Sequence, residues 1–362
     1  MHTIDGLTSP YIVVLLLRGI IFVFAASLAA LFLGLGLHKR HVVNVARSRE
    51  EKILFYAGEL VSLCAGTTAS VTAPRNLREA LSLASAFASF SFHDDAEISR
   101  AQSAIAASPE IQILKNALSS EDWGVRCRAL GAFSDLRDPA YFEYLCNFAE
   151  HEEVVRVFGS CLSACAILIR EPGQFREFSL LLDRRPVLSA SYDEGAVRTA
   201  IRSLISRSGA AESYQVMRDC LFSETLSEQY KAALINAIGK ENFTRMTDAI
   251  IDYAQVSEER IIRISAMRAL YNMGVCDGLI SRGFRSADPV VQIVAIRSSL
   301  HCDGAVEEQL VRFLGSPHFD VRYAAAMTLV KFPSGGQELL QQAKAGSDPF
   351  ATDMAEFALS VR

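Results

Sequence analysis

Few residues of this chain have the types and spacing that catalysis or metal binding requires. The sequence contains no G-x-x-x-x-G-K-[ST] phosphate loop, no G-x-S-x-G nucleophile elbow, no H-E-x-x-H zinc motif and no C-x-x-C pair. Cys161 and Cys165 lie four residues apart on an expected helix, where such a pair would supply half of a zinc site. Zinc needs three or four ligands and no second pair is near in sequence, so core cysteines are favoured. We therefore expect a protein that is not an enzyme, with no catalytic, cofactor-binding or metal-binding residues.

A column of polar residues is the first candidate for binding. The repeated pattern described below places four residues at one equivalent position of successive copies: Arg202, Asn236, Arg268 and Arg297. Equivalent positions line up on one surface when repeats stack, and guanidinium groups recognise carboxylates through paired hydrogen bonds. The column predicts a site for an acidic peptide or loop of a partner protein. The alternative is that Arg is simply common on protein surfaces.

The second candidate is an insertion near residues 181–192, where the second and third copies of the repeat are 41 residues apart instead of about 30. An insertion in a stacked repeat maps to a loop on one face, often the binding face. Asp183, Arg184 and Arg185 would then form the charged tip of that loop. A neutral surface insertion is the alternative.

The elements that carry these residues are pairs of helices in an internal repeat that begins near residue 108. An acidic residue, a β-branched or small residue, often a basic residue, and then Ala- and Leu-rich positions recur, as in DWGVRCRALGAF from Asp122 and DPVVQIVAIRSSL from Asp288. The fourth residue of each copy is an anchor for counting, and the eight anchors are Val125, Val155, Ala196, Tyr230, Ile262, Val291, Val321 and Ala351. Prolines at the joints suit the first turn of a helix, and no alternating strand pattern is evident, so an all-α fold is predicted.

The D-x-x-V-R-x-x-A-x-x-A-L pattern of these copies resembles HEAT repeats, in particular the short bacterial HEAT-like type also found in phycobilisome-lyase proteins. The resemblance covers residues 108–362 and implies an α-solenoid of about eight helix pairs. It also implies a ladder of acidic and basic side chains between repeats, which by position falls on Asp122 and Arg126, Glu152 and Arg156, and Glu259 and Arg263. The ladder is expected to break where the basic position holds another residue, namely Val197, Gln292 and Thr352.

The N-terminal part of the chain predicts a single transmembrane helix. Residues 19–37 carry no charged side chain, and with the upstream PYIVVLLL the segment 11–37 is long enough, at 1.5 Å per residue, to cross a hydrocarbon core about 30 Å thick. The first residues carry no Lys or Arg and the apolar run is too long for a cleaved signal peptide, so we expect a retained anchor. Residues 38–107 are predicted as a juxtamembrane helix followed by a helical cap.

The charges that flank this segment predict its orientation. The basic residues that follow it are Lys39, Arg40, Arg47 and Arg49. By the positive-inside rule, residues 1–10 lie outside and the repeats lie in the cytoplasm, at a bacterial inner membrane. Arg18 is expected to snorkel to the interface or to pair with an acidic group of a membrane partner. All eight cysteines follow the span and occur singly in apolar patterns, so we expect them to be reduced.

The functional expectation is a membrane-anchored, non-catalytic scaffold or accessory subunit. Its partner is expected to be a membrane-associated protein, for example an integral membrane enzyme such as a polysaccharide-synthase glycosyltransferase. The alternative, which the family resemblance implies, is a HEAT-like lyase or chromophore-handling enzyme. Nucleic-acid binding is disfavoured because 36 basic and 41 acidic residues leave a formal net charge of −5 and the chain has one Trp.

Overall fold

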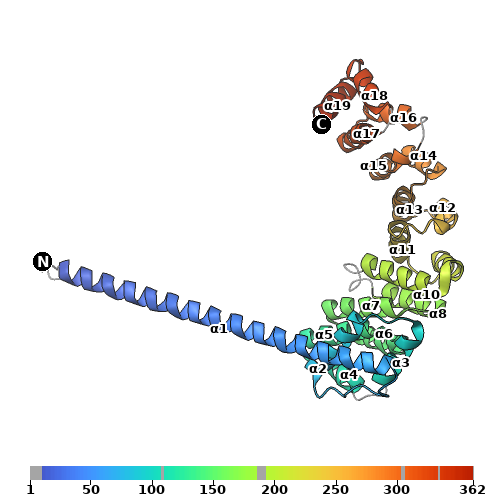
Figure 1. Cartoon of the computed structure of the whole chain (residues 1–362). Helices are drawn as coiled ribbons and strands as arrows, with labels where there is room; N and C mark the ends of the chain where they lie inside the picture. Colours follow the sequence, from blue (N-terminus) through green and yellow to red (C-terminus); the bar gives the residue numbers. More distant parts are fainter. Residues whose placement is uncertain (1–9, 107–109, 186–192, 303–305, 333–334, 362) are drawn as a thin grey trace. The chain divides into compact units, whose positions relative to one another are not determined.

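The computed structural model describes residues 10–106, 110–185, 193–302, 306–332 and 335–361. Within the first helix, the side chains of residues 10–26, 28–30 and 36 lie outside the described set, as do those of residues 110 and 193. The described part of the chain is helical and contains no β-strand, as predicted (Figure 1). It divides into two compact units, Met1–Ala117 and Leu118–Arg362. The boundary falls about ten residues after the expected start of the repeats.

The first unit is dominated by α1 (Pro10–Cys64), a continuous helix of 55 residues. Its C-terminal part packs against α2 (Leu77–Ser89) and α3 (Asp95–Ala106), and α4 (Glu110–Leu118) runs to the boundary of the unit. The core of the unit is formed by side chains such as Tyr56 and Leu60 of α1 and Leu83 and Phe87 of α2, all at most 3% exposed.

The predicted membrane span, residues 11–37, lies in α1. Most of its side chains, including that of Arg18, lie outside the described residues. Over the part of the chain that is described, no helix combines the length and the apolar character needed to cross a membrane.

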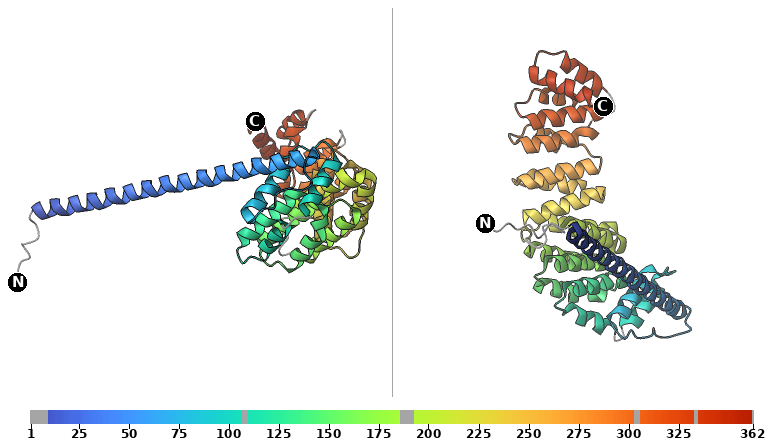
Figure 2. Two further views of the ribbon diagram at one scale, coloured as in Figure 1. Left: turned by 60° about the horizontal axis from the view of Figure 1, so that its bottom comes forward. Right: turned by 90° about the vertical axis from the view of Figure 1, so that its left-hand side faces the viewer.

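The second unit consists of helices in two rows. The inner row holds the helices that begin at the repeat motif: α5 (Trp123–Leu136), α7 (Val155–Leu168), α10 (Asp193–Leu221), α11 (Glu228–Lys240), α13 (Arg260–Asn272), α15 (Pro289–Ser298), α17 (Phe319–Lys331) and α19 (Pro349–Ser360). The outer row holds α6 (Phe142–His151), α8 (Pro172–Arg184), α12 (Thr247–Val256), α14 (Gly278–Phe284), α16 (Glu307–Phe313) and α18 (Gly336–Lys344). Each inner helix packs against the next inner helix along the chain (Figures 1 and 2).

Three short 3₁₀ turns, Pro139–Tyr141, Thr244–Met246 and Ser299–His301, complete the described elements. Helix α10 bends at Gly209, whose φ of +79° suits a residue without a Cβ atom. The bend separates the part of α10 that begins at the repeat motif from a second part that leads toward α11, and α10 as a whole packs against α7, α8 and α11.

In three of the inner helices, the acidic residue at the head of the motif caps the helix N-terminus. The carboxylates of Asp122, Asp288 and Asp348 accept hydrogen bonds from the backbone N–H groups of the first turn, at 2.7 to 2.9 Å. This is helix N-capping, which satisfies N–H groups that have no partner within the helix. Pro289 and Pro349 follow at the first helical position, as the sequence predicts.

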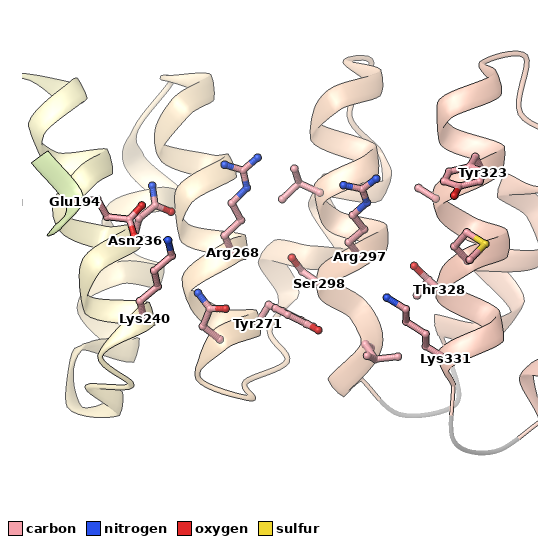
Figure 3. A pocket seen from close by; sticks show the side chains of 15 residues that line it. Glu194, Asn236, Lys240, Arg268, Tyr271, Arg297, Ser298, Tyr323, Thr328 and Lys331 are labelled. Carbon is pink, nitrogen blue, oxygen red and sulfur yellow. Dashed lines mark hydrogen bonds and ion pairs between the residues drawn. The ribbon is translucent and has the colours of Figure 1, made fainter. Parts of the chain in front are cut away.

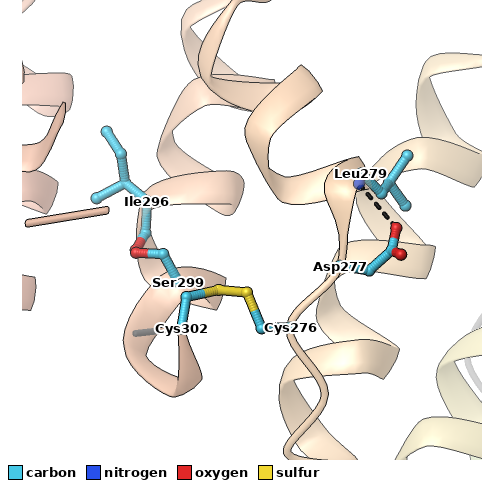
Figure 4. Close-up of a disulfide and its surroundings, with 6 residues drawn as sticks. All are labelled: Cys276, Asp277, Leu279, Ile296, Ser299 and Cys302. Carbon is cyan, nitrogen blue, oxygen red and sulfur yellow. Dashed lines mark hydrogen bonds between the residues drawn. A yellow bond between two sulfur atoms is a disulfide. The ribbon is translucent and has the colours of Figure 1, made fainter. Parts of the chain in front are cut away.

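One expectation about the cysteines is wrong. Cys276 and Cys302 form a disulfide, with Cα atoms 5.2 Å apart (Figure 4). Cys276 lies in the turn after α13 and Cys302 directly follows the 3₁₀ turn after α15, so the bond joins the ends of two neighbouring inner helices. The six other cysteines are free thiols, four of them buried.

Candidate partner-binding groove

The groove crosses four inner helices, α11, α13, α15 and α17, and has a volume of about 630 Å³ (Figure 3). Three of the four residues of the predicted column line it, namely Asn236, Arg268 and Arg297. They project from the middle of successive helices, because the repeat places them at one equivalent position. The guanidinium groups of Arg268 and Arg297 extend to the same side of the row.

The charge of the groove is basic. Its lining includes four cationic side chains, Lys240, Arg268, Arg297 and Lys331, and one carboxylate, that of Glu194. Glu194 forms an ion pair with Lys240. Arg268, Arg297 and Lys331 are exposed and form no ion pair with any carboxylate in the described part of the chain. These three cations are therefore available to an anionic ligand.

Uncharged polar and aromatic groups lie between the cations. The rings of Tyr271 and Tyr323 line the groove, as do the buried side chains of Ser298 and Thr328. The amide of Asn236 donates a 3.1 Å hydrogen bond to Ser265 Oγ, which fixes that side chain to the next helix. Hydroxyl groups and cations suit the carboxylates and backbone of a peptide.

Arg202, the fourth residue of the predicted column, does not line the groove. Its Nε lies 3.4 Å from Glu241 Oε2, and Arg198 Nε donates to the other oxygen of the same carboxylate at 2.6 Å. Glu241 follows the last residue of α11 and thereby joins α10 to α11. The column is consequently divided: Arg202 forms an ion pair within the chain, whereas the next three positions line the groove.

The residues expected at the tip of an inserted loop lie elsewhere. Asp183 and Arg184 belong to the last turn of α8, and Arg185 follows directly. Asp183 accepts a 3.0 Å hydrogen bond from the N–H of Ser227, and Arg184 forms a 3.0 Å ion pair with Glu150. Arg185 donates to the carbonyl groups of residues 149 and 150, at 2.9 Å each. All three groups thus make contacts within the chain, and the rest of the predicted insertion, 186–192, lies outside the described residues.

The sequence interpretation missed Lys240, Lys331 and both tyrosines. Lys240 lies four residues after Asn236, and Lys331 lies four residues after Met327, which occupies the column position of the seventh copy. Residues four apart share a helix face. The residues four positions after the column on each inner helix share its face, and including them would have predicted both lysines as part of the surface.

The buried cysteines do not form a metal site. Cys146 Sγ lies 3.9 Å from Cys165 Sγ, and Cys161 Sγ donates to the carbonyl of Leu145 at 3.2 Å. The hydrogen bond to Cys165 and burial raise the pKa of Cys146 far above that of a free thiol, so this group stays protonated. Among the described residues, no three His, Cys, Asp or Glu side chains are placed to hold a metal ion.

The basic residues that follow the predicted span lie on α1. Lys39 and Arg40 are exposed, Arg47 lies 3.6 Å from Glu51 one turn later, and Arg49 donates to Ser85 Oγ of α2 at 3.3 Å. Arg49 thus contributes to the packing of the first unit, whereas the other three form a collar on the exposed helix.

Comparison with the models of known protein families finds no match, and no curated protein sequence matches the chain, so no activity is carried over from a relative.

Proposed function

We propose that this chain is a HEAT-like helical-repeat scaffold whose basic groove binds an acidic segment of a partner protein. The observation that carries the proposal is the alignment of Arg268, Arg297 and Lys331 along one groove with no carboxylate partner among the described residues. Guanidinium groups spaced by one helix width recognise successive carboxylates. The regular packing of each inner helix on the next, together with the repeat pattern, supports the solenoid interpretation.

The proposal includes a membrane location. The apolar segment 11–37 serves as a single-pass anchor in a bacterial inner membrane, with the repeats in the cytoplasm. The Cys276–Cys302 disulfide argues against this side of the membrane, because disulfides are rare in the reducing cytoplasm. The membrane location rests on the sequence of the segment and on the basic residues Lys39, Arg40, Arg47 and Arg49. A partner at that surface is a membrane-associated protein, and an integral membrane enzyme such as a polysaccharide-synthase glycosyltransferase is one version.

The test is charge reversal in the groove. A tagged full-length chain is purified in mild detergent from the cells that produce it, and the proteins that remain bound are identified. We expect Arg268→Glu with Arg297→Glu to lose a partner that the wild-type chain retains, because two attractive contacts become repulsive.

The matched control makes the same charge change on the outer row. Arg245 and Arg282 are exposed and lie in the 3₁₀ turn before α12 and in α14, so Arg245→Glu with Arg282→Glu should retain the partner. An identical set of bound proteins for the wild type and the groove variant, with both variants folded by circular dichroism, would refute the proposal.

A further inference from the structure

A cluster of exposed aromatic rings continues the groove toward the C-terminus. Phe319 and Tyr323 of α17 and Phe350 and Phe357 of α19 are between 36% and 59% exposed. Ring centroids lie 6.2 Å apart for Phe319 and Tyr323 and 6.0 Å apart for Tyr323 and Phe357. Large apolar side chains that gather on a surface mark binding sites more often than single exposed ones. We call these four residues the aromatic shelf.

The shelf is held in place by Arg322. Its guanidinium carbon lies 5.6 Å from the ring centre of Phe319 and 4.7 Å from that of Phe350, and it donates to the carbonyl of Ser316 at 2.7 Å. These contacts fix the two rings and engage the cation. Arg322 is therefore a structural part of the shelf, whose exposed surface is formed by the rings.

The shelf and the groove are continuous. Tyr323 lines the groove and also contacts Phe357 of the shelf. The repeat gives the same result, since the column position continues from Arg268 and Arg297 to Met327 in the seventh copy and Phe357 in the eighth. Along four neighbouring inner helices, equivalent positions are thus basic, basic, apolar and apolar.

We infer that the partner segment is an extended peptide with two acidic residues at one end and two large apolar residues at the other. This inference rests on the proposed function and specifies its ligand. Charge complementarity assigns the acidic residues to Arg268 and Arg297, and the apolar residues then cover Met327 and the shelf.

The spacing within the peptide follows from the packing. Neighbouring packed helices have axes about 8–10 Å apart. An extended chain in the polyproline II conformation advances about 3.1 Å per residue with three residues per turn, so that side chains three residues apart lie on the same side. One helix step therefore corresponds to about three residues. The peptide pattern is acidic-x-x-acidic-x-x-apolar-x-x-aromatic, in one of the two chain directions.

The experiment measures fluorescence anisotropy of labelled synthetic peptides with the full-length chain in mild detergent. Two probes carry Glu, Glu, Leu and Phe at three-residue intervals, in forward and in reversed order, with Gly and Ser between them. A third and a fourth carry Ala in place of Leu and Phe. We expect one of the first two to bind at least about tenfold more tightly than its Ala counterpart, since the counterpart lacks both apolar side chains and burial of the Phe side chain alone contributes about this much.

Two substitutions assign that gain to the shelf. Phe357→Ala should weaken the apolar probe about tenfold and leave the Ala probe unchanged. Phe222→Ala is the matched control, because Phe222, which directly follows α10, is 40% exposed and lies outside the shelf. It should change neither affinity, and thermal melts of both variants check that the fold is intact.

The outcomes separate the two proposals. If the probes bind, lose affinity with Arg268→Glu and Arg297→Glu, but respond equally to Phe357→Ala and Phe222→Ala, the shelf inference is wrong and the acidic-segment proposal stands. If a probe with two-residue intervals binds as tightly as the three-residue probe, the inferred spacing is wrong. If charge reversal in the groove changes no peptide affinity and no co-purifying protein, the proposed function fails.

Discussion

Arg126 and Glu152 form an almost fully buried ion pair between the first two copies of the repeat. Their side chains are 13% and 7% exposed, and Arg126 Nε lies 3.1 Å from Glu152 Oε2. Arg126 Nη2 donates a 3.2 Å hydrogen bond to Glu152 Oε1, whereas the Nε–H of Arg126 forms no hydrogen bond within the described part of the chain. Removing one charge of a buried pair leaves the other uncompensated. We expect Glu152→Gln to lower the free energy of unfolding by about 3 kcal/mol.

Urea unfolding measures this loss, and Glu153→Gln is the control because Glu153 is the exposed neighbour. Equal midpoints for the two variants would show that the pair contributes nothing.

The ladder was predicted from the repeat only in part. Arg126 and Glu152 interact between repeats as the pattern implies, but Arg156 lies over the ring of Trp123 at 5.0 Å, and Arg260 rather than Arg263 pairs with Asp288. A motif fixes which positions face the neighbouring repeat, whereas the choice of partner depends on the rotamers and loops around them.

The expected break at Gln292 is also incomplete. Gln292 donates to the carbonyl of Ser286 at 2.8 Å, six residues earlier. Arg126 and Arg322 make the same contact, with the carbonyls of Ser120 and Ser316. The amide of Gln292 thus makes the hydrogen bond to the backbone carbonyl that arginine makes in the other copies. The expected break considered only the ion pair and did not include this hydrogen bond.

A polar network of Glu228, Lys231 and Tyr253 makes stability depend on pH. Lys231 donates to Glu228 Oε1 at 2.9 Å and to Tyr253 Oη at 2.8 Å, and Tyr253 donates to the same Glu228 oxygen at 2.6 Å. Burial alone would raise the pKa of Glu228, but the hydrogen bonds from Tyr253 and Lys231 lower it below its ordinary value. Burial alone would lower the pKa of Lys231, and the same bonds raise it.

The direction of this pH dependence follows from the coupling between proton binding and folding. A carboxylate with a lowered pKa stabilises the fold above its ordinary pKa of about 4.3, and this contribution disappears as pH falls through the lowered value. Lys231 contributes below its ordinary pKa of about 10.4 and loses the contribution as pH rises through the raised value. Between these limits the network is intact.

We therefore expect Glu228→Gln to cost about 2 kcal/mol at pH 7, since it leaves the buried ammonium of Lys231 without its counterion. The difference from the wild type should shrink as pH falls below about 4. Urea midpoints between pH 3 and 7 measure it, with Glu224→Gln as the exposed control. A difference that is constant over this range would contradict the linkage.

At the scale of the elements, the disulfide joins the ends of α13 and α15, which carry Arg268 and Arg297. It closes a segment with a sequence separation of 26. Closing a loop of this length stabilises a fold by about 3 kcal/mol, chiefly by restricting the unfolded chain. We expect a reducing agent to lower the melting temperature of the wild type by several degrees and to leave Cys276→Ser unaffected.

Cys127→Ser, which alters a free thiol of the same unit, should keep the response to reduction. A wild-type melt that is insensitive to the reductant would show that the bond does not contribute. The sequence did not indicate this pair, because only the stacking of α13 and α15 brings the two turns within 5.2 Å, and the spacing of the cysteines follows no known framework.

Helices α11 and α13 approach closely at Gly239. A Cβ atom at this position would lie 2.5 Å from Ala269 Cα, which is backbone and does not yield as a side chain would. Gly239→Ala should therefore move the two helices apart and lower the free energy of unfolding by about 2 kcal/mol. It should also weaken the binding of any ligand that contacts both Lys240 and Arg268.

Gly131→Ala is the opposite case. Gly131 lies within α5 with open space around its Cα, so alanine should stabilise the helix by up to about 1 kcal/mol. Thermal melts and peptide affinity measure both variants; a stable Gly239→Ala chain with unchanged affinity would contradict the close approach.

The elements were more predictable than the site. Helix starts are encoded locally, since Asp122, Asp288 and Asp348 cap their own helices and need no distant partner. The column is encoded by periodicity, which placed Arg268 and Arg297 on one surface. Arg202 was misplaced because Glu241, from another helix, pairs with it, and such a contact is set by tertiary packing.

At the scale of the whole molecule, the groove and the N-terminal segment belong to different units, so the anchor and the binding surface can be tested independently. The collar Lys39, Arg40 and Arg47 and the apolar segment 11–37 are the features on which the membrane proposal depends. If the segment spans the membrane, a fluorescent protein fused at the C-terminus fluoresces and an alkaline phosphatase at the same position is inactive.

Deleting residues 1–37 should move the chain from the membrane fraction to the supernatant after carbonate extraction, because the deletion removes the whole apolar segment and leaves the second unit intact. Peptide affinity at Arg268 and Arg297 should be unchanged in the shortened chain, while co-purification of a membrane partner should fall, since tethering raises the local concentration of the groove at the bilayer. Replacing Lys39, Arg40 and Arg47 with Glu should leave the chain in the membrane fraction and lower C-terminal fluorescence. A full-length chain that carbonate extracts completely would refute the anchor, and an active C-terminal phosphatase would refute the orientation; neither result would affect the groove.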